Sequence, residues 1–227
     1  MSRQLSSGAR RQRGLSLVEL LVGAAIGLVV AAAAGKLLAG HLRESRSLLL
    51  EARLMQDLRT STDLVTRDLR RAGYWGGAAS GVWLAGASGV LANPYAAWPA
   101  GTAASDAISF QFSRDGSENH SIDSNERFGF RLRSGTLEMQ LGAANWQALT
   151  DASTLTVTAF SITPTVQSVS LAGYCAHACA GSACPQQQLR SLAVRLTGRA
   201  IADTSLSRSA HSEVRLRNDV ITGACPA

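Results

Sequence analysis

The feature that most limits how this chain can fold is an uncharged run of sixteen residues, 20–35, close to the N-terminus. Glu19 stands immediately before this run and Lys36 immediately after it. A carboxylate at membrane depth costs about 3 kcal/mol on insertion scales. Either this segment stays out of a membrane, or Glu19 has a partner and a role there.

Two general interpretations account for residues 1–42. A secretory signal peptide would use the small residues 31–34 as its cleavage site, and a plain membrane anchor would use the apolar run itself as its span. Both agree with the charge distribution, because four of the six units of net positive charge precede the run, as in a membrane-orienting flank. Those four residues are Arg3, Arg10, Arg11 and Arg13.

A third interpretation comes from the sequence RGLSLVEL, residues 13–20, which resembles the N-terminal signal of type IV pilins and type II secretion pseudopilins. In those proteins prepilin peptidase removes a basic leader that ends in glycine, and the new N-terminal residue is N-methylated. The resemblance implies cleavage between Gly14 and Leu15, methylation of Leu15, and a mature chain with Glu19 in its fifth position. Leu15 departs from the phenylalanine usual after the cut. The first proline is Pro94, and the lack of an earlier one favours the minor pilin subclass.

Physical chemistry favours this third interpretation. Leu15 and Glu19 are four residues apart and would lie on one face of a helix. The free amine of a processed Leu15, in the same chain or in a neighbouring subunit, would neutralise Glu19 and fix the axial register of a filament. The apolar region of a signal peptide has no comparable use for a carboxylate. We therefore expect Glu19 to be a subunit docking charge.

The pattern after the leader, residues 1–14, predicts one helix with two different halves. Residues 15–42 would form the transmembrane or filament-core half. Residues 43–72 would form an amphipathic half, because apolar residues recur there at spacings of three and four, with Thr62 the one polar member. Gly73 would end the helix. The expected stripe consists of Leu48, Ala52, Met55, Leu58, Thr62, Val65, Leu69 and Ala72.

Residues 73–227 are expected to form a β-rich globular domain with a cysteine-containing tail. Its first part is rich in glycine, alanine and aromatic residues, and Trp75, Trp83, Tyr95 and Trp98 are expected to pack onto the domain. Alternating apolar residues then predict strands around residues 108–112, 128–132, 137–141, 155–162, 192–196 and 214–216. The sequence RSGT, residues 133–136, predicts a hairpin turn, and a bulge is expected within the strand of residues 155–162. A long helix followed by antiparallel strands is an α+β fold with the helix on one sheet face.

The order of these pieces, from RDLRRAGYWGG at the helix end to VRLRND near the C-terminus, resembles the PilW family of minor type IV pilins. The resemblance implies a type IV pilin-like fold and a non-catalytic subunit of the pilus tip or priming complex, supporting adhesion, twitching motility or DNA uptake. It implies prepilin peptidase, other minor pilins, the major pilin and a tip adhesin as partners. The chain would lie in the inner membrane with one span and a periplasmic C-terminal domain before assembly, and in the pilus at the cell surface afterwards.

Two alternatives stay open at this stage. The related pseudopilin J of type II secretion has the same pattern. From another class, a membrane-anchored periplasmic binding module would need neither the cut after Gly14 nor Glu19.

Four cysteines lie in the last quarter of the chain: Cys175, Cys179, Cys184 and Cys225. With His177 they could bind zinc, but they lack a tight C-x₂-C pair, and export to an oxidising compartment favours disulfides. Four cysteines allow three connectivities. We expect Cys225 to bond to one of the first three, and the other two to close a small loop.

Residues 115–126, DGSENHSIDSNE, gather oxygen ligands between two strands. Calcium is one interpretation, but the order lacks the spacing of an EF-hand, so a solvated loop is favoured. The chain has no nucleophile elbow, P-loop, dinucleotide fingerprint or H-E-x-x-H motif, so we expect no enzyme, metal or cofactor. No stripe of basic residues with interleaved aromatics appears after the leader, so the basic balance says little about nucleic acid, and no direct nucleic-acid partner is assigned.

Overall fold

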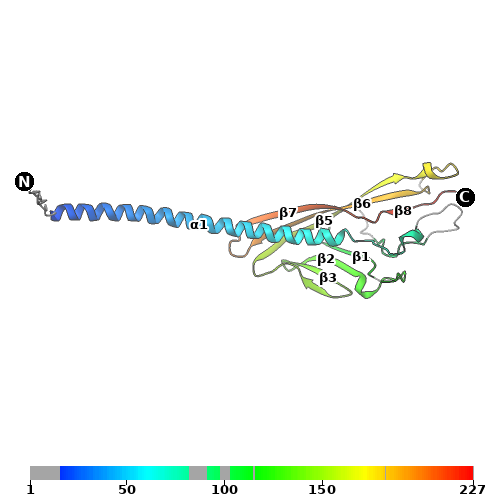
Figure 1. Ribbon diagram of the computed structural model, residues 1–227, viewed down its shortest axis with the longest axis horizontal. Coiled ribbons are helices and arrows are strands. Elements are labelled where there is room, and N and C mark those ends of the chain that lie inside the picture. Colours follow the sequence, from blue (N-terminus) through cyan, green and yellow to red (C-terminus); the bar gives the residue numbers. More distant parts are fainter. Residues whose placement is uncertain (1–15, 82–90, 98–102, 115, 182, 227) are drawn as a thin grey trace, which may run out of the picture. The chain divides into compact units, whose positions relative to one another are not determined.

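The computed structural model describes residues 16–81, 91–97, 103–114, 116–181 and 183–226. The chain divides into two compact units, Met1–Leu49 and Leu50–Ala227. One long helix, α1 (Leu17–Leu69), is followed by two antiparallel sheets (Figure 1). The α+β fold expected from the sequence is therefore confirmed.

In the first unit, α1 exposes its apolar side chains. Leu17, Leu28 and Leu38 are each between 62% and 75% exposed. By its length and composition α1 contains one segment that could cross a membrane. An apolar surface of this extent marks a site of contact with lipid or with other protein.

In the second unit, α1 is covered on one face by the domain. Its buried apolar residues are Leu54, Leu58, Val65 and Leu69. Leu48 and Ala52, which the sequence pattern placed on the buried stripe, are exposed, because burial of the helix begins at Leu54.

The covered face of α1 is also wider than the apolar stripe, because it includes Ser61 and Thr66 beside Thr62. The Thr62 hydroxyl donates to the Leu58 carbonyl at 2.8 Å, and the Thr66 hydroxyl donates to the Asp63 carbonyl at 3.1 Å. Both threonines can therefore be buried without leaving a polar group unpaired.

The helix ends through Gly73, as expected, although regular α-helix stops at Leu69 and turn residues fill the interval. Gly73 has a φ of 73°, a left-handed conformation that costs glycine little. Its N–H donates to the carbonyl of Gln111 at 2.8 Å. This bond ties the end of the helix to the end of the first strand.

The first sheet has the order β1-β2-β3-β4. Its strands are β1 (Ala107–Gln111), β2 (Arg127–Arg133), β3 (Thr136–Leu141) and β4 (Trp146–Ala148). The β2–β3 turn places Ser134 at φ 49° and Gly135 at φ 77°, and two positive values are the signature of a type I′ hairpin turn. The predicted RSGT turn is thus confirmed, whereas the three-residue strand β4 was not expected.

The second sheet contains β5 (Leu155–Ser170), β6 (Gln186–Ala200) and β7 (Ser207–Arg215), and β8 (Val220–Thr222) pairs with β6. A register shift between Val157 and Ala159 is the expected bulge. β5 continues well beyond Ile162, where the predicted strand ended. It passes through Pro164, which an edge strand accepts because the missing N–H is not needed for pairing.

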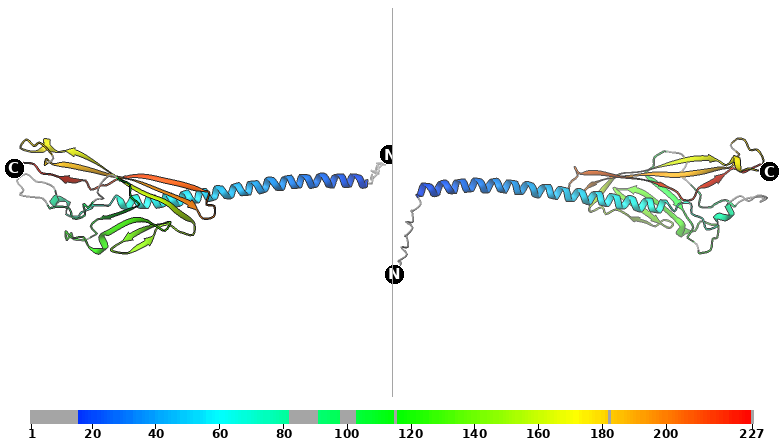
Figure 2. Two further views of the ribbon diagram at one scale, coloured as in Figure 1. Left: turned by 180° about the vertical axis from the view of Figure 1, so that it is seen from behind. Right: turned by 45° about the horizontal axis from the view of Figure 1, so that its top comes forward.

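One hydrophobic cluster joins α1 to both sheets. Figure 2 shows the C-terminal part of α1 running alongside both of them. Phe112 and Phe128 stack with ring centroids 4.1 Å apart. On β6, a Cβ at Gly198 would lie 3.2 Å from a methyl carbon of Leu58, so glycine leaves room for the helix.

Of the four aromatic residues expected to pack onto the domain, Trp75 and Tyr95 are buried, with exposures of 4% and 0%. Trp83 and Trp98 lie outside the described residues. The described part of the second unit also contains three short 3₁₀ helices: η1 (Ala78–Gly81), η2 (Ser124–Glu126) and η3 (Ala172–Tyr174).

Candidate functional site

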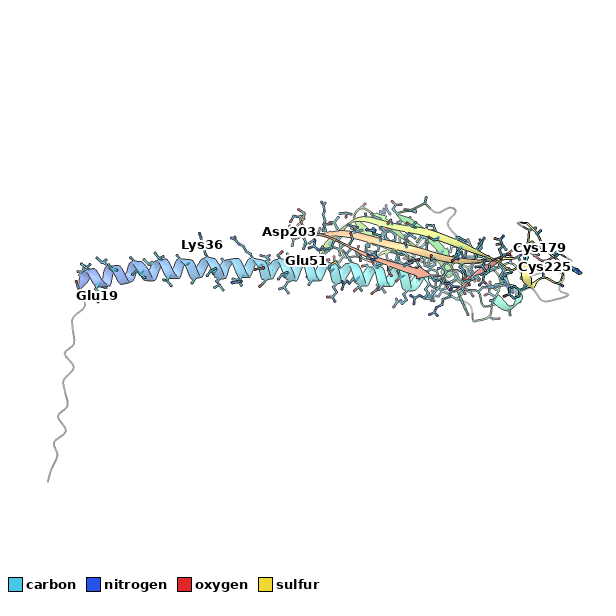
Figure 3. All side chains as sticks on the ribbon, turned by 90° about the horizontal axis from the view of Figure 1, so that it is seen from above. Glu19, Lys36, Glu51, Cys179, Asp203 and Cys225 are labelled. Atoms are coloured by element: carbon cyan, nitrogen blue, oxygen red, sulfur yellow. A yellow bond between two sulfur atoms is a disulfide. The ribbon has the colours of Figure 1, made fainter. Side chains whose placement is uncertain are left out.

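The first candidate site is the beginning of α1. Glu19 lies in its first turn, where a carboxylate interacts favourably with the positive end of the helix dipole (Figure 3). Its side chain is exposed between the exposed apolar residues Val18 and Leu20. Gly14 and Leu15, the predicted cleavage and methylation residues, lie outside the described residues.

Glu19 has no ion-pair partner within 4.0 Å among the residues that the structure describes. Lys36, the next charged residue along α1, follows seventeen residues later. At a rise of 1.5 Å per residue this spacing is about 26 Å, far too long for a direct contact. A counter-charge for Glu19 would therefore have to come from the preceding residues or from another molecule.

The helix surface around this site permits close approach of a second helix. A Cβ atom added at Gly23 or Gly27 would meet no atom within 4 Å. Small residues of this kind allow helices to pack closely in an apolar environment.

The second candidate site is the cysteine-rich tail. Cys175 is bonded to Cys225 and Cys179 to Cys184, with Cα atoms 5.4 and 5.7 Å apart. This is the expected arrangement, in which Cys225 returns to one of the first three cysteines. The 175–225 bond ties the segment after β8 to the segment after β5, and Ala224 adds a backbone hydrogen bond to Ala183 at 3.1 Å. Figure 3 shows Cys179 and Cys225 at the same end of the domain.

The four sulfurs that a zinc ion would need are all in these two disulfides. Among the described residues, no group of three or more His, Cys, Asp and Glu side chains is arranged to hold a metal ion.

The third candidate site, the loop of residues 115–126, is not the simple solvated loop that the sequence favoured. Asp115 lies outside the described residues, but Glu126 is fully buried. Its carboxylate accepts hydrogen bonds from the N–H groups of Arg114 at 2.7 Å and Asp123 at 2.9 Å, and from the Tyr95 hydroxyl at 3.2 Å. These donors replace the water that the carboxylate loses on burial, which is why a charged residue can leave the surface here.

Glu118 extends the same network. It accepts hydrogen bonds from the N–H groups of Gly76 and His120, both at 3.0 Å. It also lies 3.1 Å from the Tyr95 hydroxyl, whose single proton Glu118 and Glu126 share. Burial alone would raise the pKa of the Glu118 carboxyl, but the hydrogen bonds, led by that from His120, lower it below its usual value. Burial and the two nearby carboxylates raise the pKa of Tyr95. The network therefore fastens the loop to the segment after α1.

Two models of known protein families match the chain. The prokaryotic N-terminal methylation motif matches residues 9–35, a range that includes Gly14, Leu15 and Glu19. The family described as prepilin peptidase-dependent protein B matches residues 47–216, about three quarters of the chain. The chain belongs to this family. No curated protein and no solved structure matches it.

As a member of this family, the chain is a type IV pilin-like protein of the minor pilin or pseudopilin class. The two matches imply processing by prepilin peptidase and assembly with other pilins. The family favours a structural, non-catalytic subunit. The methylation motif and the apolar part of α1 are consistent with membrane anchoring and pilus assembly.

Proposed function

We propose that this protein is a minor type IV pilin of the PilW kind, a non-catalytic subunit of the complex that primes pilus assembly and stands at the pilus tip. The observation that carries the proposal is the position of Glu19. It is a single exposed carboxylate in the first turn of an apolar helix, inside a segment that matches the N-terminal methylation motif.

The four parts of the chain then have successive roles. Residues 1–14 are the leader that prepilin peptidase removes, and Leu15 becomes the methylated N-terminus. Residues 15–42 hold the protein in the inner membrane, with its C-terminal domain in the periplasm, and later enter the core of the filament. Residues 43–72 connect this segment to the domain of residues 73–227, which other minor pilins, the major pilin and a tip adhesin contact.

Glu19 is the charge that docks one subunit on the next. In an apolar filament core, an unpaired carboxylate is costly, and the amine of a neighbouring Leu15 removes that cost. Docking on this pair also fixes the axial position of the incoming subunit. Burial of the exposed apolar face of α1 against neighbouring helices supplies the affinity.

The first prediction concerns processing. Mass spectrometry of the mature protein from its native host should find an N-terminus at methylated Leu15. Gly14→Ala should be cleaved far better than Gly14→Val, because the branched side chain is the larger obstacle beside the scissile bond. An intact leader, or an N-terminus near Ala34 or Gly35, would contradict the pilin assignment and favour the anchor or the signal peptide.

A pseudopilin of type II secretion, J-like in kind, shares the leader, the helix and the docking charge, so the two functions must be separated in cells. Deleting the gene should remove surface pili and the motility, adhesion or DNA uptake that depends on them, while secretion of soluble enzymes continues. Loss of secretion with normal pili would assign the chain to the secretion system instead. If the chain were a membrane-anchored binding module, deleting the gene would change neither the pili nor secretion.

A further inference from the structure

An arginine-rich groove lies at the C-terminal end of α1. Two adjoining hollows of about 470 and 590 Å³ share Arg70 and Arg217 in their walls. Their positively charged lining comes from two segments nearly 150 residues apart in the sequence, the end of α1 with the turn after it, and the end of β7 with the residues after it. The five arginines of the groove are Arg67, Arg70, Arg71, Arg215 and Arg217.

Hydrogen bonds hold these two segments together. The side-chain amide of Asn218 donates to the Ala72 carbonyl at 3.2 Å, and the buried guanidinium of Arg190 donates to the Asn218 carbonyl at 3.1 Å. On the other side, the Ser113 N–H donates to the Tyr74 carbonyl at 2.9 Å. The groove is therefore built into the fold.

The groove carries more positive charge than its neighbourhood neutralises. Asp68 lies 3.9 Å from Arg67, and Asp219 lies 3.1 Å from Arg215. For the other three arginines, the described part of the chain supplies no carboxylate within 4.0 Å. A position near the end of a helix explains part of this charge through the helix dipole, but it does not explain Arg215 at the end of β7 or Arg217 after it. Like charges gathered in one place repel, so a bound anion would be stabilised here.

The walls of the groove suit an anion that also carries aromatic rings. Tyr74 is 50% exposed and lines the same hollow as the arginines. The guanidinium of Arg71 lies 4.1 Å from the centre of the Phe112 ring, which restrains it in one place. Arginine pairs with phosphate oxygens in a bidentate manner, and an exposed aromatic ring stacks on nucleic-acid bases.

We propose that this groove binds a single strand of nucleic acid, with its phosphates on the arginines and a base stacked on Tyr74. Lipid headgroups fit less well, because Arg67 is seventeen residues, or about 26 Å of helix, beyond the start of the second unit at Leu50. The acidic face of another protein would use the charge but would not need the exposed tyrosine. The site is distinct from Glu19 and does not depend on the pilus assignment.

The test uses the full-length protein in detergent and a fluorescently labelled oligothymidylate of about 16 nucleotides at about 150 mM salt. Arg70→Gln/Arg217→Gln should weaken binding by at least about tenfold and reduce the salt dependence, the slope of log K against log salt, by about 1.4 for two lost phosphate contacts. Arg195→Gln/Arg199→Gln on the exposed side of β6 is the matched control, because it removes the same charge outside the groove. It should change affinity by less than about twofold.

Tyr74→Ala should weaken binding of the single strand by about fivefold or more and leave the salt slope unchanged, since it removes stacking only. A duplex of the same length should bind more weakly than the single strand. Equal losses in the two double variants would mean non-specific attraction and would overturn the proposal. So would duplex binding as tight as that of the single strand, or polyglutamate binding as tight as DNA, which would point to an acidic protein partner.

Discussion

At the scale of single residues, two glutamates show how surroundings decide what a carboxylate does. Glu126 is fully buried, yet three donors satisfy it, and its effect is to hold a loop in place. Glu19 is exposed on an apolar helix, and no described residue is close enough to form an ion pair with it. The hydrogen-bond partners of Glu126 all lie within the chain, whereas a counter-charge for Glu19 must come from beyond the described residues.

Glu126→Gln should therefore destabilise the domain. The amide has only one acceptor oxygen, and its NH₂ group would face a backbone N–H that now lacks a partner. We expect the free energy of unfolding to fall by about 1–3 kcal/mol. Urea unfolding of the full-length protein in detergent, followed by tryptophan fluorescence, measures it. Glu213→Gln, at an exposed position of β7, is the control, and equal midpoints for the two variants would contradict the role given to Glu126.

The lowered pKa of Glu118 predicts a pH dependence of stability. A carboxyl whose pKa is lower in the folded than in the unfolded state stabilises the fold above the unfolded value, about 4.3. That contribution is lost as the pH falls through the folded value. Hydrogen bonds from Ser153 and Ser205 lower the pKa of Asp151 and Asp203 and act in the same direction.

The urea midpoint should accordingly be nearly constant from about pH 7 to pH 5 and fall between about pH 5 and pH 3. Glu118→Gln should make that fall shallower and lower the midpoint at pH 7. Glu213→Gln should leave the slope as in the wild type. If Glu118→Gln retained the full wild-type slope, the hydrogen bonds to its carboxylate would not be the source of the acid sensitivity.

At the scale of elements, local sequence patterns correctly predicted the features that nearby residues determine. The spacing of Leu58, Val65 and Leu69 predicted a buried helix face, and RSGT predicted the β2–β3 turn. The features that depend on pairing between distant strands were missed. The continuation of β5 past Pro164 depends on its place at the sheet edge, and the short β8 depends on pairing with β6.

The candidate sites divide in the same way. The beginning of α1 was visible as a motif, because its residues are contiguous. The burial of Glu126 depends on donors such as Tyr95, thirty-one residues away, and the groove requires Arg70 and Arg217 to meet. The sequence signal for the groove is only two separate arginine-rich stretches, RDLRR and RLR, with nothing to show that they are adjacent.

The two disulfides should contribute unequally to stability. The chain-entropy model gives about 4 kcal/mol for a bond that spans 50 residues and about 2 kcal/mol for one that spans 5. Cys175→Ser/Cys225→Ser should therefore lower the free energy of unfolding more than Cys179→Ser/Cys184→Ser, by urea titration. Thiol labelling of the denatured, unreduced wild type should find no free cysteine. Stoichiometric zinc, lost on chelation, would instead support the metal site.

At the scale of the whole molecule, the two units of the chain differ in whether they bury their own apolar residues. Residues 50–227 bury a core that joins helix and sheets, and they carry both disulfides. Residues 16–49 have no buried face of their own, as is expected of a segment that lipid or other subunits cover. A change at Glu19 should therefore affect assembly and leave folding intact.

Glu19→Ala is the variant that separates these two properties. The domain should fold normally, because the first buried residue of α1 is Leu54. Membrane insertion should be intact or slightly better, since removal of a carboxylate from the apolar phase recovers about 3 kcal/mol. Cleavage after Gly14 should also proceed. What should fail is methylation of Leu15 or entry into the filament, where the partner amine would remain unpaired in an apolar core.

Glu19→Gln should show the same defect in a milder form, because its amide oxygen still accepts a hydrogen bond from the amine but carries no charge. Incorporation of each variant into pili is measured by immunoblotting sheared pili from cells that lack the native copy, with membrane fractions as the control for expression. We expect the order wild type, then Gln, then Ala. If all three entered the pilus equally, the counter-charge would be dispensable, and burial of the apolar face of α1 alone would have to set the position of each subunit.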